Sequence, residues 1–400
     1  MIPRTSYIKK LLDLKDKNII KVITGIRRSG KSTILKLYKE NLKNLGVNEE
    51  RIVNINFEDN QYRDLLDEKN LYDYITSKIG LKEKYYIILD EIQSVKNFER
   101  CVNSLFLREN VDIYITGSNS YMLSGELATF LTGRYMQIHV LPLSFKEFLS
   151  GVGEQNEMKA YEKYLKNGGL PYILNLDDNS ELIRNYLDSI YSTVVIKDIV
   201  SKRNISDVNL LESITRYLFD NVGSYISIKK ISDTLTSMGR KNSVSTIENY
   251  VSSLLESYIM YKVNRYDIKG KQHLKTLEKY YLSDLGLRTY LLGNKKAGDM
   301  GHLLENVVFL ELKRKGYEIY VGKNNDMEVD FVIINQDGLK YIQVALSVRS
   351  EKTLERELRV LKNLNDNYPK YILTLDYDTA DYDGIKQFGV IDFLLERENI

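Results

Sequence analysis

"GIRRSGKST", residues 25–33, is the most informative stretch of this chain for its fold. It matches the pattern G-x-x-x-x-G-K-[ST], in which a glycine-containing turn leads from a strand into a helix and surrounds phosphate groups with backbone N–H groups. The apolar run "IIKVIT" precedes the turn, and the helix-forming run "KSTILKLYKENL" follows it. Gly25 and Gly30 permit the turn, and the positive end of the helix dipole favours an anion there. The sequence therefore predicts a phosphate-binding α/β core.

The side chains of this turn predict an ATP site that also holds Mg²⁺. Lys31 is expected to reach the β- and γ-phosphates, and the Ser32 hydroxyl is expected to be a ligand of the metal ion. Thr33 completes a predicted ATP-binding set whose other members are Gly25, Gly30, Lys31 and Ser32. ATP and Mg²⁺ are therefore the predicted cofactors.

A second apolar run, "YYIILDEIQ", ends in two carboxylates. Asp90 is expected to lie beside the metal ion and to hold it directly or through water. Glu91 follows at once, and we expect it to orient or deprotonate the attacking water, an effect typically of ~10²–10⁴-fold in rate. The alternative is that both acids only close the end of a strand.

Further polar residues are candidates for contacts with the nucleotide. Asn119, after the run "DIYITGS", is expected to lie between the γ-phosphate and the water, or else to form a local turn. Arg134, in "LTGR", is a candidate arginine finger, and such fingers contribute ~10³–10⁵ in rate. It could act in its own chain or in a neighbouring subunit of a homo-oligomer, or be an exposed surface residue. Arg27 and Arg28 in the turn are weaker candidates for a nucleotide or interface contact, with simple exposure as the alternative. Glu58 and Asp59 in "NFED" are weaker candidates for the same cleft.

Length and composition limit the class of protein. The 400 residues suggest two to four domains, and 43% hydrophobic residues are enough to build their cores. The 57 basic and 55 acidic residues nearly cancel, so any nucleic-acid binding must come from local patches. Cys101 is the single cysteine, and with three scattered histidines it gives no metal-ligand cluster. No apolar run approaches the ~20 residues of a membrane span, and no signal region opens the chain, so the sequence predicts a cytoplasmic protein without membrane contact.

The pattern of runs along the chain predicts four domains. Short apolar runs alternate with helical patterns over residues 17–145, which is typical of a parallel sheet covered by helices on both faces. The pattern is then helical, with "GGLP" at residues 168–171 separating two helices. The predicted domains are an ATPase core over 1–150, a helical lid over 151–222, a winged helix over 223–296 and a nuclease-like α/β domain over 297–400.

The third of these domains predicts contact with DNA. A helix–turn–helix pattern ends in "VSTIENYVSSLLESYI", and two strand-like runs follow it, which is a winged-helix order of elements. Basic residues flank that helix and fill the loop between the two strands; they are Arg240, Lys241, Lys269, Lys271 and Lys275. Glu248 and Glu256 on the helix oppose phosphate approach. The basic residues around the helix permit contacts with the DNA backbone more than reading of bases. A role in protein contact or in structure alone is the alternative.

In the closing stretch "EVDFVIINQDGLKYIQVA", polar residues are spaced along two successive strands as in a metal-dependent nuclease. With Glu305 in the helix before it, Asp330 at the end of a strand and Gln343 on the next, it resembles the restriction-endonuclease-like fold. Active members of that fold use an acidic residue, an Asp, Glu-x-Lys and Mg²⁺, in which the lysine stabilises charge on the scissile phosphate. Ala345 stands where that lysine would be, so the resemblance implies a remnant of a nuclease site formed by Glu305, Asp330 and Gln343.

Taken together, the motifs resemble one family. The segments "GIRRSGKST", "NFED", "ILDEIQ", "TGSNSYMLS", "LTGR", "LPLSFKEF", "GGLP" and "EVDFVI…IQVA" look like those of the prokaryotic AAA+ superfamily P-loop ATPases that carry a C-terminal domain of unknown function. In that family they correspond to Walker A, Walker B, sensor 1, an arginine finger, a helical lid, a winged helix and a nuclease-like module. The resemblance implies a P-loop NTPase core of the AAA+ type.

The predicted function is an ATP-hydrolysing switch or motor that acts on or with DNA. One alternative is a signalling or protein-interaction switch that binds ATP and hydrolyses it rarely. Another is an ATP-gated, metal-dependent nuclease, which needs another residue to replace the lysine absent at Ala345. The pair Asp90–Glu91 favours turnover, whereas the acidic recognition helix favours the protein-interaction switch.

Overall fold

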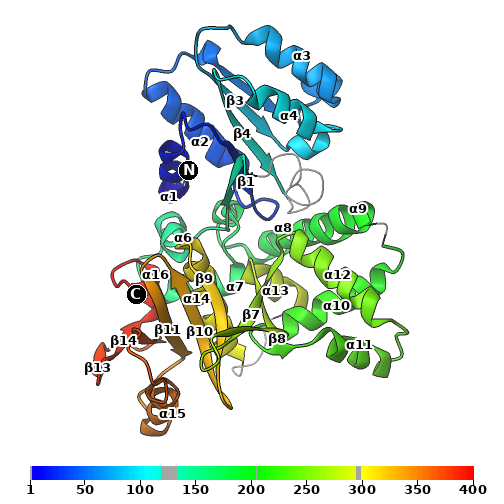
Figure 1. The fold of residues 1–400 in the computed structure, drawn as a ribbon. Helices are drawn as coiled ribbons and strands as arrows, with labels where there is room; N and C mark the ends of the chain where they lie inside the picture. Colours follow the sequence, from blue (N-terminus) through cyan, green and yellow to red (C-terminus); the bar gives the residue numbers. More distant parts are fainter. Residues whose placement is uncertain (1, 119–132, 204, 294–298) are drawn as a thin grey trace. The chain divides into compact units, whose positions relative to one another are not determined.

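A computed structural model describes residues 2–118, 133–203, 205–293 and 299–400 (Figure 1). The chain forms two compact units. The first consists of residues 1–142 with Glu256–Tyr258, and the second of Leu143–Leu255 with Ile259–Ile400. The division at residue 142 lies close to the predicted end of the ATPase core at 150. The lid, winged-helix and nuclease-like boundaries stay predictions.

The first unit is built on a five-stranded parallel sheet with the strand order β2-β3-β4-β1-β5. Its strands are β1 (Ile20–Thr24), β2 (Ile52–Asn56), β3 (Tyr85–Asp90), β4 (Val111–Gly117) and β5 (Tyr135–His139). They fall within residues 17–145, where the sequence predicts a parallel sheet. The inner strands β1, β3 and β4 are buried along almost their whole length because both of their faces are covered, whereas the edge strands β2 and β5 are partly exposed. The predicted α/β P-loop fold is confirmed.

Helices cover both faces of this sheet. Neighbouring side chains on a strand point to opposite faces, so Val22 packs in one core cluster and Ile23 in the other. The cluster around Ile23 includes Tyr38 of α2, and the cluster around Val22 includes Leu105 of α4. The helices of this unit are α1 (Thr5–Asp13), α2 (Lys31–Asn44), α3 (Glu68–Lys78) and α4 (Phe98–Phe106). The turn of residues 25–30 leads from the end of β1 in the sheet to the start of α2 on one of its faces.

The second unit begins with helices. They are α6 (Phe145–Val152), α7 (Glu157–Asn167), α8 (Ser180–Tyr191), a π-helix (Ser192–Val200), α9 (Ser201–Arg203) and α10 (Val208–Asp220). Gly168 ends α7 with φ 82°, a conformation that favours glycine. A Cβ at Gly168 would lie 2.2 Å from the carboxylate of Asp284, which accepts a hydrogen bond of 2.7 Å from the Gly169 N–H. The "GGLP" turn is therefore held by a buried carboxylate more than a hundred residues away.

A helix–turn–helix and a hairpin follow, as the sequence predicts. They consist of β6 (Tyr225–Ile226), α11 (Ile228–Ser237), α12 (Val244–Glu256), β7 (Met260–Asp267), β8 (Gln272–Leu282) and α13 (Leu285–Leu292). The hairpin is continuous with the C-terminal sheet, because β7 pairs in parallel with β9 (Glu318–Asn324). The nine-stranded sheet has the order β13-β14-β12-β11-β10-β9-β7-β8-β6, so the predicted boundary at 296/297 does not interrupt it.

The rest of the second unit completes this sheet. Its elements are α14 (Met300–Arg314), β10 (Met327–Asn335), β11 (Gly338–Ala345), α15 (Glu351–Lys362), β12 (Lys370–Thr374), β13 (Ala380–Tyr382), β14 (Ile385–Gly389) and α16 (Val390–Leu394). Val332, Tyr341, Leu361 and Ile372 share one core cluster. Within the described part of the chain, no helix has the length and apolar character that crossing a membrane requires.

Candidate nucleotide site

The turn between β1 and α2 has a backbone that only glycine fits at its first position. Gly25 has φ 145°, and a Cβ there would lie 2.1 Å from the carbonyl oxygen of Val140. Gly30 precedes α2 with φ 97°, and Arg28 between them also has a positive φ of 67°. Positive φ at a non-glycine residue is strained and concentrates at functional sites. The close approach of the Val140 carbonyl explains Gly25, and the positive φ explains Gly30. The turn leaves backbone N–H groups at the start of a helix, where an anion is favoured.

Lys31 lies folded against this turn. Its side chain is 4% exposed, and its Nζ donates to the carbonyl oxygens of Gly25 at 3.1 Å and Ile26 at 3.3 Å. Glu91 Oε1 lies 4.0 Å from the same Nζ. Burial lowers the pKa of Lys31, and Glu91 and Asp90 oppose that shift. The turn thus holds a cation against neutral backbone groups, which fits a nucleotide phosphate.

The two carboxylates predicted from "YYIILDEIQ" lie at the carboxyl end of β3. Asp90 is buried, and both the Ser32 and Thr116 hydroxyls hydrogen-bond to it. Burial raises the pKa of Asp90, and those hydroxyls oppose the rise. The structure therefore brings together Ser32 and Asp90, the two predicted Mg²⁺ ligands. A hydroxyl beside a carboxylate is an oxygen donor set that suits this ion.

Glu91 has a strained backbone and a defined position. Its φ is 57°, its N–H donates to Thr116 Oγ1 at 2.8 Å, and Gln93 Nε2 donates to its carboxylate. Thr116 on β4 therefore contacts both Asp90 and Glu91. Sequence reasoning missed Thr116, although its place at the end of the strand next to β3 is a usable signal, since parallel strands end at one edge.

Arg4 is a second residue that sequence reasoning missed. It is buried, and its guanidinium donates to the Ser29 carbonyl at 3.2 Å and to the Leu141 carbonyl at 2.7 Å. These contacts join the segment before α1 to the turn of residues 25–30 between β1 and α2, which is called the phosphate turn below. In addition, Arg27 within the turn pairs with Glu58 at 3.0 Å, which places the end of β2 at the same edge. No local motif marks Arg4, because its partners are backbone carbonyls.

Arg134 lies at the opposite edge of the sheet. Its carbonyl accepts from Ile20 N–H, at the amino end of β1, whereas the phosphate turn follows the carboxyl end of that strand. Five residues of strand separate the two edges by roughly 16 Å. The guanidinium instead donates to Asn103 Oδ1 at 2.7 Å. A contact with the phosphates of its own chain is out of reach, and only the action on a neighbouring subunit stays a prediction. Asn119 lies outside the described residues.

A second cluster of charged residues lies in the C-terminal sheet. Gln343 Oε1 accepts from the Asp330 N–H at 3.2 Å, and Asp330 Oδ2 accepts from the Val344 N–H at 2.7 Å. The charge of Glu305 acts on Asp330, so the three predicted remnant residues come together. The prediction that Ala345 leaves this place without a cation is wrong, because Lys279 of β8 supplies one. The lysine comes from a strand that only the shared sheet brings to the cluster.

Lys279 is held by carboxylates on two sides. Its Nζ lies 2.8 Å from Glu305 Oε1 and 2.6 Å from Glu328 Oε1, and its side chain is 4% exposed. Burial by itself lowers the pKa of Lys279, but Glu305, Asp330 and Glu328 outweigh it and raise the pKa. Burial also raises the pKa of Asp330, with a further contribution from Glu305. Across the described residues, no three His, Cys, Asp or Glu side chains are grouped to hold a metal ion.

Four of the five basic residues predicted to meet DNA are solvent-exposed. Lys269 and Lys271 lie in the turn between β7 and β8, and Arg240 and Lys241 precede α12. The exposed face of α12 carries Glu248 and Asn249, as the helical pattern predicts. The side chain of Lys275 lies outside the part that the structure describes.

Among the matches to known protein families, the most informative one covers the first unit. A family model described as an AAA domain matches residues 17–149, and one described as a domain of unknown function (DUF8612) matches residues 158–298. An uncharacterized protein of Haemophilus influenzae is 40% identical over 402 residues, which covers 99% of each chain. An uncharacterized protein of Methanocaldococcus jannaschii is 32% identical, over 94% of this chain and 85% of its own.

Likeness to solved structures is weaker. The Aeropyrum pernix Orc1 protein, solved in complex with DNA, aligns at 12% identity over 73% of this chain and 92% of that chain, with a TM-score of 0.34. Aquifex aeolicus DnaA, solved with AMPPCP, aligns at 15% identity over 63% and 87%, with the same TM-score of 0.34.

Proposed function

We propose that this chain, which belongs to the same family as the Haemophilus influenzae protein and carries an AAA domain, binds and hydrolyses ATP with Mg²⁺. The observation that supports this most is the arrangement of Lys31, Glu91 and Asp90 around one strained turn. Lys31 approaches Glu91 at 4.0 Å, and Asp90 accepts from the Ser32 hydroxyl. A cation for the phosphates, a metal-binding carboxylate and a second carboxylate that can act as a base thus share one edge of the sheet.

Each of these side chains has a distinct role in the proposal. Lys31 exchanges its two backbone carbonyl acceptors for the β- and γ-phosphate oxygens of ATP. Ser32 and Asp90 would hold Mg²⁺, which when bound neutralises charge on the same phosphates. Glu91 orients the attacking water and accepts its proton, while Thr116 and Gln93 fix the position of that residue.

ATP turnover, measured with and without single- and double-stranded DNA, tests this function. Wild-type protein is expected to release phosphate from ATP, and Lys31→Ala is expected to lose ATP binding. A Thr116→Val protein, which keeps the shape of the buried side chain, should bind ATP but turn over more slowly. ATP binding by the Lys31→Ala protein with wild-type affinity would remove the phosphate turn from the proposal.

We propose that DNA is the partner of the second unit, through the exposed cations beside α12 and in the β7–β8 turn. Lys269 and Lys271 stand at the tip of the hairpin, where a phosphate backbone could approach them. Stimulation of ATP turnover by DNA supports this partner. Stimulation by a protein and none by DNA would favour the alternative, a protein-interaction switch.

We propose that the chain works as a homo-oligomer in which Arg134 acts on the nucleotide of a neighbouring subunit. Its place at the sheet edge opposite its own phosphate turn supports action between subunits. Mixing Arg134→Ala protein with Lys31→Ala protein should then restore part of the turnover, because each supplies what the other lacks. A monomer whose turnover is unchanged by Arg134→Ala would remove this role.

The Lys279 cluster favours a structural role over nuclease activity. Lys279 supplies the cation missing at Ala345, but Glu305 and Glu328 already pair with it. We expect no cleavage of linear, nicked or branched DNA with Mg²⁺ or Mn²⁺. Cleavage by the wild-type protein that disappears in an Asp330→Ala protein would reverse this expectation and make Lys279 the catalytic cation.

A further inference from the structure

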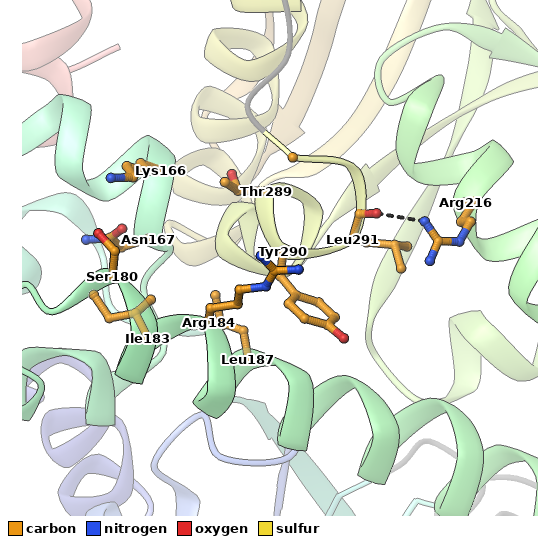
Figure 2. A pocket seen from close by; sticks show the side chains of 11 residues that line it. Lys166, Asn167, Ser180, Ile183, Arg184, Leu187, Arg216, Thr289, Tyr290 and Leu291 are labelled. Carbon is orange, nitrogen blue, oxygen red and sulfur yellow. Dashed lines mark hydrogen bonds between the residues drawn. The ribbon is translucent and has the colours of Figure 1, made fainter.

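A cavity of about 530 Å³ lies among α7, α8, α10 and α13 (Figure 2). Its described lining shares no residue with the turn that holds Lys31 or with the charged cluster around Lys279. It falls within the range of roughly 300–1,000 Å³ that small-molecule sites occupy. All of its described lining residues belong to the second unit. Its walls come from helices that are far apart in the sequence, so it is a product of the tertiary fold.

Three cations from three helices line the cavity. Lys166 comes from the end of α7, Arg184 from α8 and Arg216 from α10. Figure 2 shows Arg184 between Lys166 and Arg216 in the view. No carboxylate is among the described lining residues, and no described residue forms an ion pair with any of the three. The three cations therefore keep their charged groups without an ion-pair partner among the described residues.

The carboxylates near the cavity are already engaged. Asp188 accepts a hydrogen bond from the Tyr290 hydroxyl, and burial together with that bond raises the pKa of Tyr290 to about 12. Asp178 accepts from the Asn167 amide at 3.2 Å and pairs with Lys163 at 3.2 Å. Neither forms an ion pair with Lys166, Arg184 or Arg216 in the part of the chain that the structure describes. Tyr290 stays a neutral hydroxyl at any physiological pH.

The cavity also offers an apolar floor and hydroxyl groups. Ile183, Leu187 and Leu291 are buried at its base, while Ser180, Thr289 and Tyr290 add hydroxyls to the wall. Arg216 is held in place, because its Nη1 donates to the Leu291 carbonyl at 2.8 Å and leaves its other N–H groups for a ligand. Apolar surface with a few converging polar groups is typical of a small-molecule site.

We infer that this cavity binds a small organic phosphate monoester with an apolar body. A phosphate monoester carries a charge of about −1.5 to −2 at neutral pH. This charge balances three cations more fully than the single negative charge of a carboxylate ligand would. Arginine binds phosphate through paired N–H donors, and such charge-assisted bonds are about twice as strong as neutral ones. The apolar body of the ligand would cover Ile183 and Leu187.

Isothermal titration of the full chain with 1-naphthyl phosphate tests the inference. Wild-type protein should bind this probe, and 1-naphthol should bind much more weakly because it lacks the phosphate. Arg184→Gln is expected to weaken the affinity about tenfold or more, and Arg184→Lys should lie between, since it keeps the charge but loses the planar donor pair. The far-ultraviolet circular dichroism of each variant checks that its helices have formed.

Two control variants distinguish binding in this cavity from binding elsewhere on the protein. Lys159 is exposed on α7 like Lys166 but does not line the cavity. Lys166→Gln should weaken binding severalfold, whereas the matched variant Lys159→Gln should leave it unchanged. Lys31→Ala should also bind the probe as wild type does, because the cavity is distinct from the phosphate turn.

Three outcomes would overturn the inference. The first is binding that Lys31→Ala abolishes and Arg184→Gln preserves, which would place the probe at the phosphate turn. The second is equal affinity for 1-naphthol and 1-naphthyl phosphate, which would mean that the cavity recognises apolar surface alone. The third is a wild-type protein that shows no saturable binding at millimolar probe concentrations.

Discussion

Lys31 in the first unit and Lys279 in the second are both buried beside carboxylates, and the two lysines differ in what surrounds their charge. Lys31 in the first unit donates to two backbone carbonyls and is 4.0 Å from Glu91. Lys279 in the second unit lies 2.8 Å from Glu305 and 2.6 Å from Glu328. At Lys31 burial outweighs the carboxylates, and the pKa is lowered. At Lys279 the carboxylates outweigh burial, and the pKa is raised.

This difference separates a cation that can act on a ligand from one that stabilises a fold. The hydrogen bonds of Lys31 go to neutral backbone carbonyls, and its nearest paired carboxylate, Glu91, lies 4.0 Å away, so these partners offset its charge less than the closer carboxylates offset that of Lys279. Glu305 and Glu328 neutralise Lys279, so an incoming phosphate would have to break buried ion pairs first. Burial alone therefore does not mark a catalytic lysine, and the identity of its partners does.

The largest expected effect is on turnover at Glu91. Glu91→Gln keeps the size and the Gln93 contact but removes the base, so ATP should bind while the turnover number falls by ~10²–10⁴. Single-turnover kinetics with radiolabelled ATP measure both quantities in one experiment. Glu58→Gln, an exposed carboxylate at the same sheet edge, is the matched control and should lower turnover far less. If the Glu91→Gln protein turned over ATP at the wild-type rate, Glu91 would lose its proposed role as the base. The contrast between a catalytic site around Lys31 and a structural cluster around Lys279 would then be weaker.

The second effect is on stability at Lys279. Lys279→Met leaves two carboxylates without their cation, and breaking such a buried pair typically costs about 3–5 kcal/mol. Lys262→Met is the control, because Lys262 forms a more exposed pair of 3.7 Å with Glu278 in the same hairpin and should cost about 0–1 kcal/mol. Urea unfolding followed by tyrosine fluorescence compares the two. Equal costs would mean that Lys279 gains nothing from its partners.

Asp284 extends the comparison to a buried carboxylate held by backbone N–H groups. Burial raises its pKa to about 6 in the folded chain, from a usual value of 3.8, although the N–H groups of Gly169 and Leu287 oppose the rise. Below pH 3.8 the Asp284 carboxyl is protonated in both the folded and the unfolded chain, and its contribution to the free energy of unfolding is fully present. As pH rises to about 6 the unfolded chain loses the proton first, so up to about 3 kcal/mol of stability is lost.

Unfolding of wild type and Asp284→Asn at several pH values tests this sign. The stability advantage of wild type over Asp284→Asn should shrink as pH rises from about 4 to about 6 and stay constant above that. An advantage that instead grows over the same interval would show that the backbone donors, and not burial, control this carboxylate.

The smallest expected effect concerns lysines that are not buried at all. Charge reversal at Lys269 and Lys271 should weaken DNA binding and flatten the slope of log affinity against log salt by ~0.9 for each phosphate that the variant no longer contacts. Lys159→Glu, on exposed α7 surface, is the control and should leave the slope unchanged. Fluorescence anisotropy across a salt series measures the slope. Tight binding that does not depend on salt would contradict a backbone-contact role.

Local patterns in the sequence were sufficient to predict the phosphate turn, the five parallel strands and the carboxylates that follow β3. Gly25, Lys31 and Asp90 each belong to a short run whose strand or helix is contiguous with it, so ordinary periodicity and turn chemistry were enough to find them. The closing stretch also predicted that Glu305, Asp330 and Gln343 would meet, since the order of helix and strands brings them to one sheet.

The partners that come from distant strands depend instead on tertiary structure. Lys279 reaches Glu305 because β7 pairs with β9 and carries β8 into the same sheet, a pairing that no local pattern reports. Thr116 meets Asp90 because β4 lies beside β3, and Arg134 lies at the far edge because β5 runs parallel to β1. Strand order is set by burial over the whole sheet, so the charge around each lysine depends on contacts between segments that the linear pattern does not order.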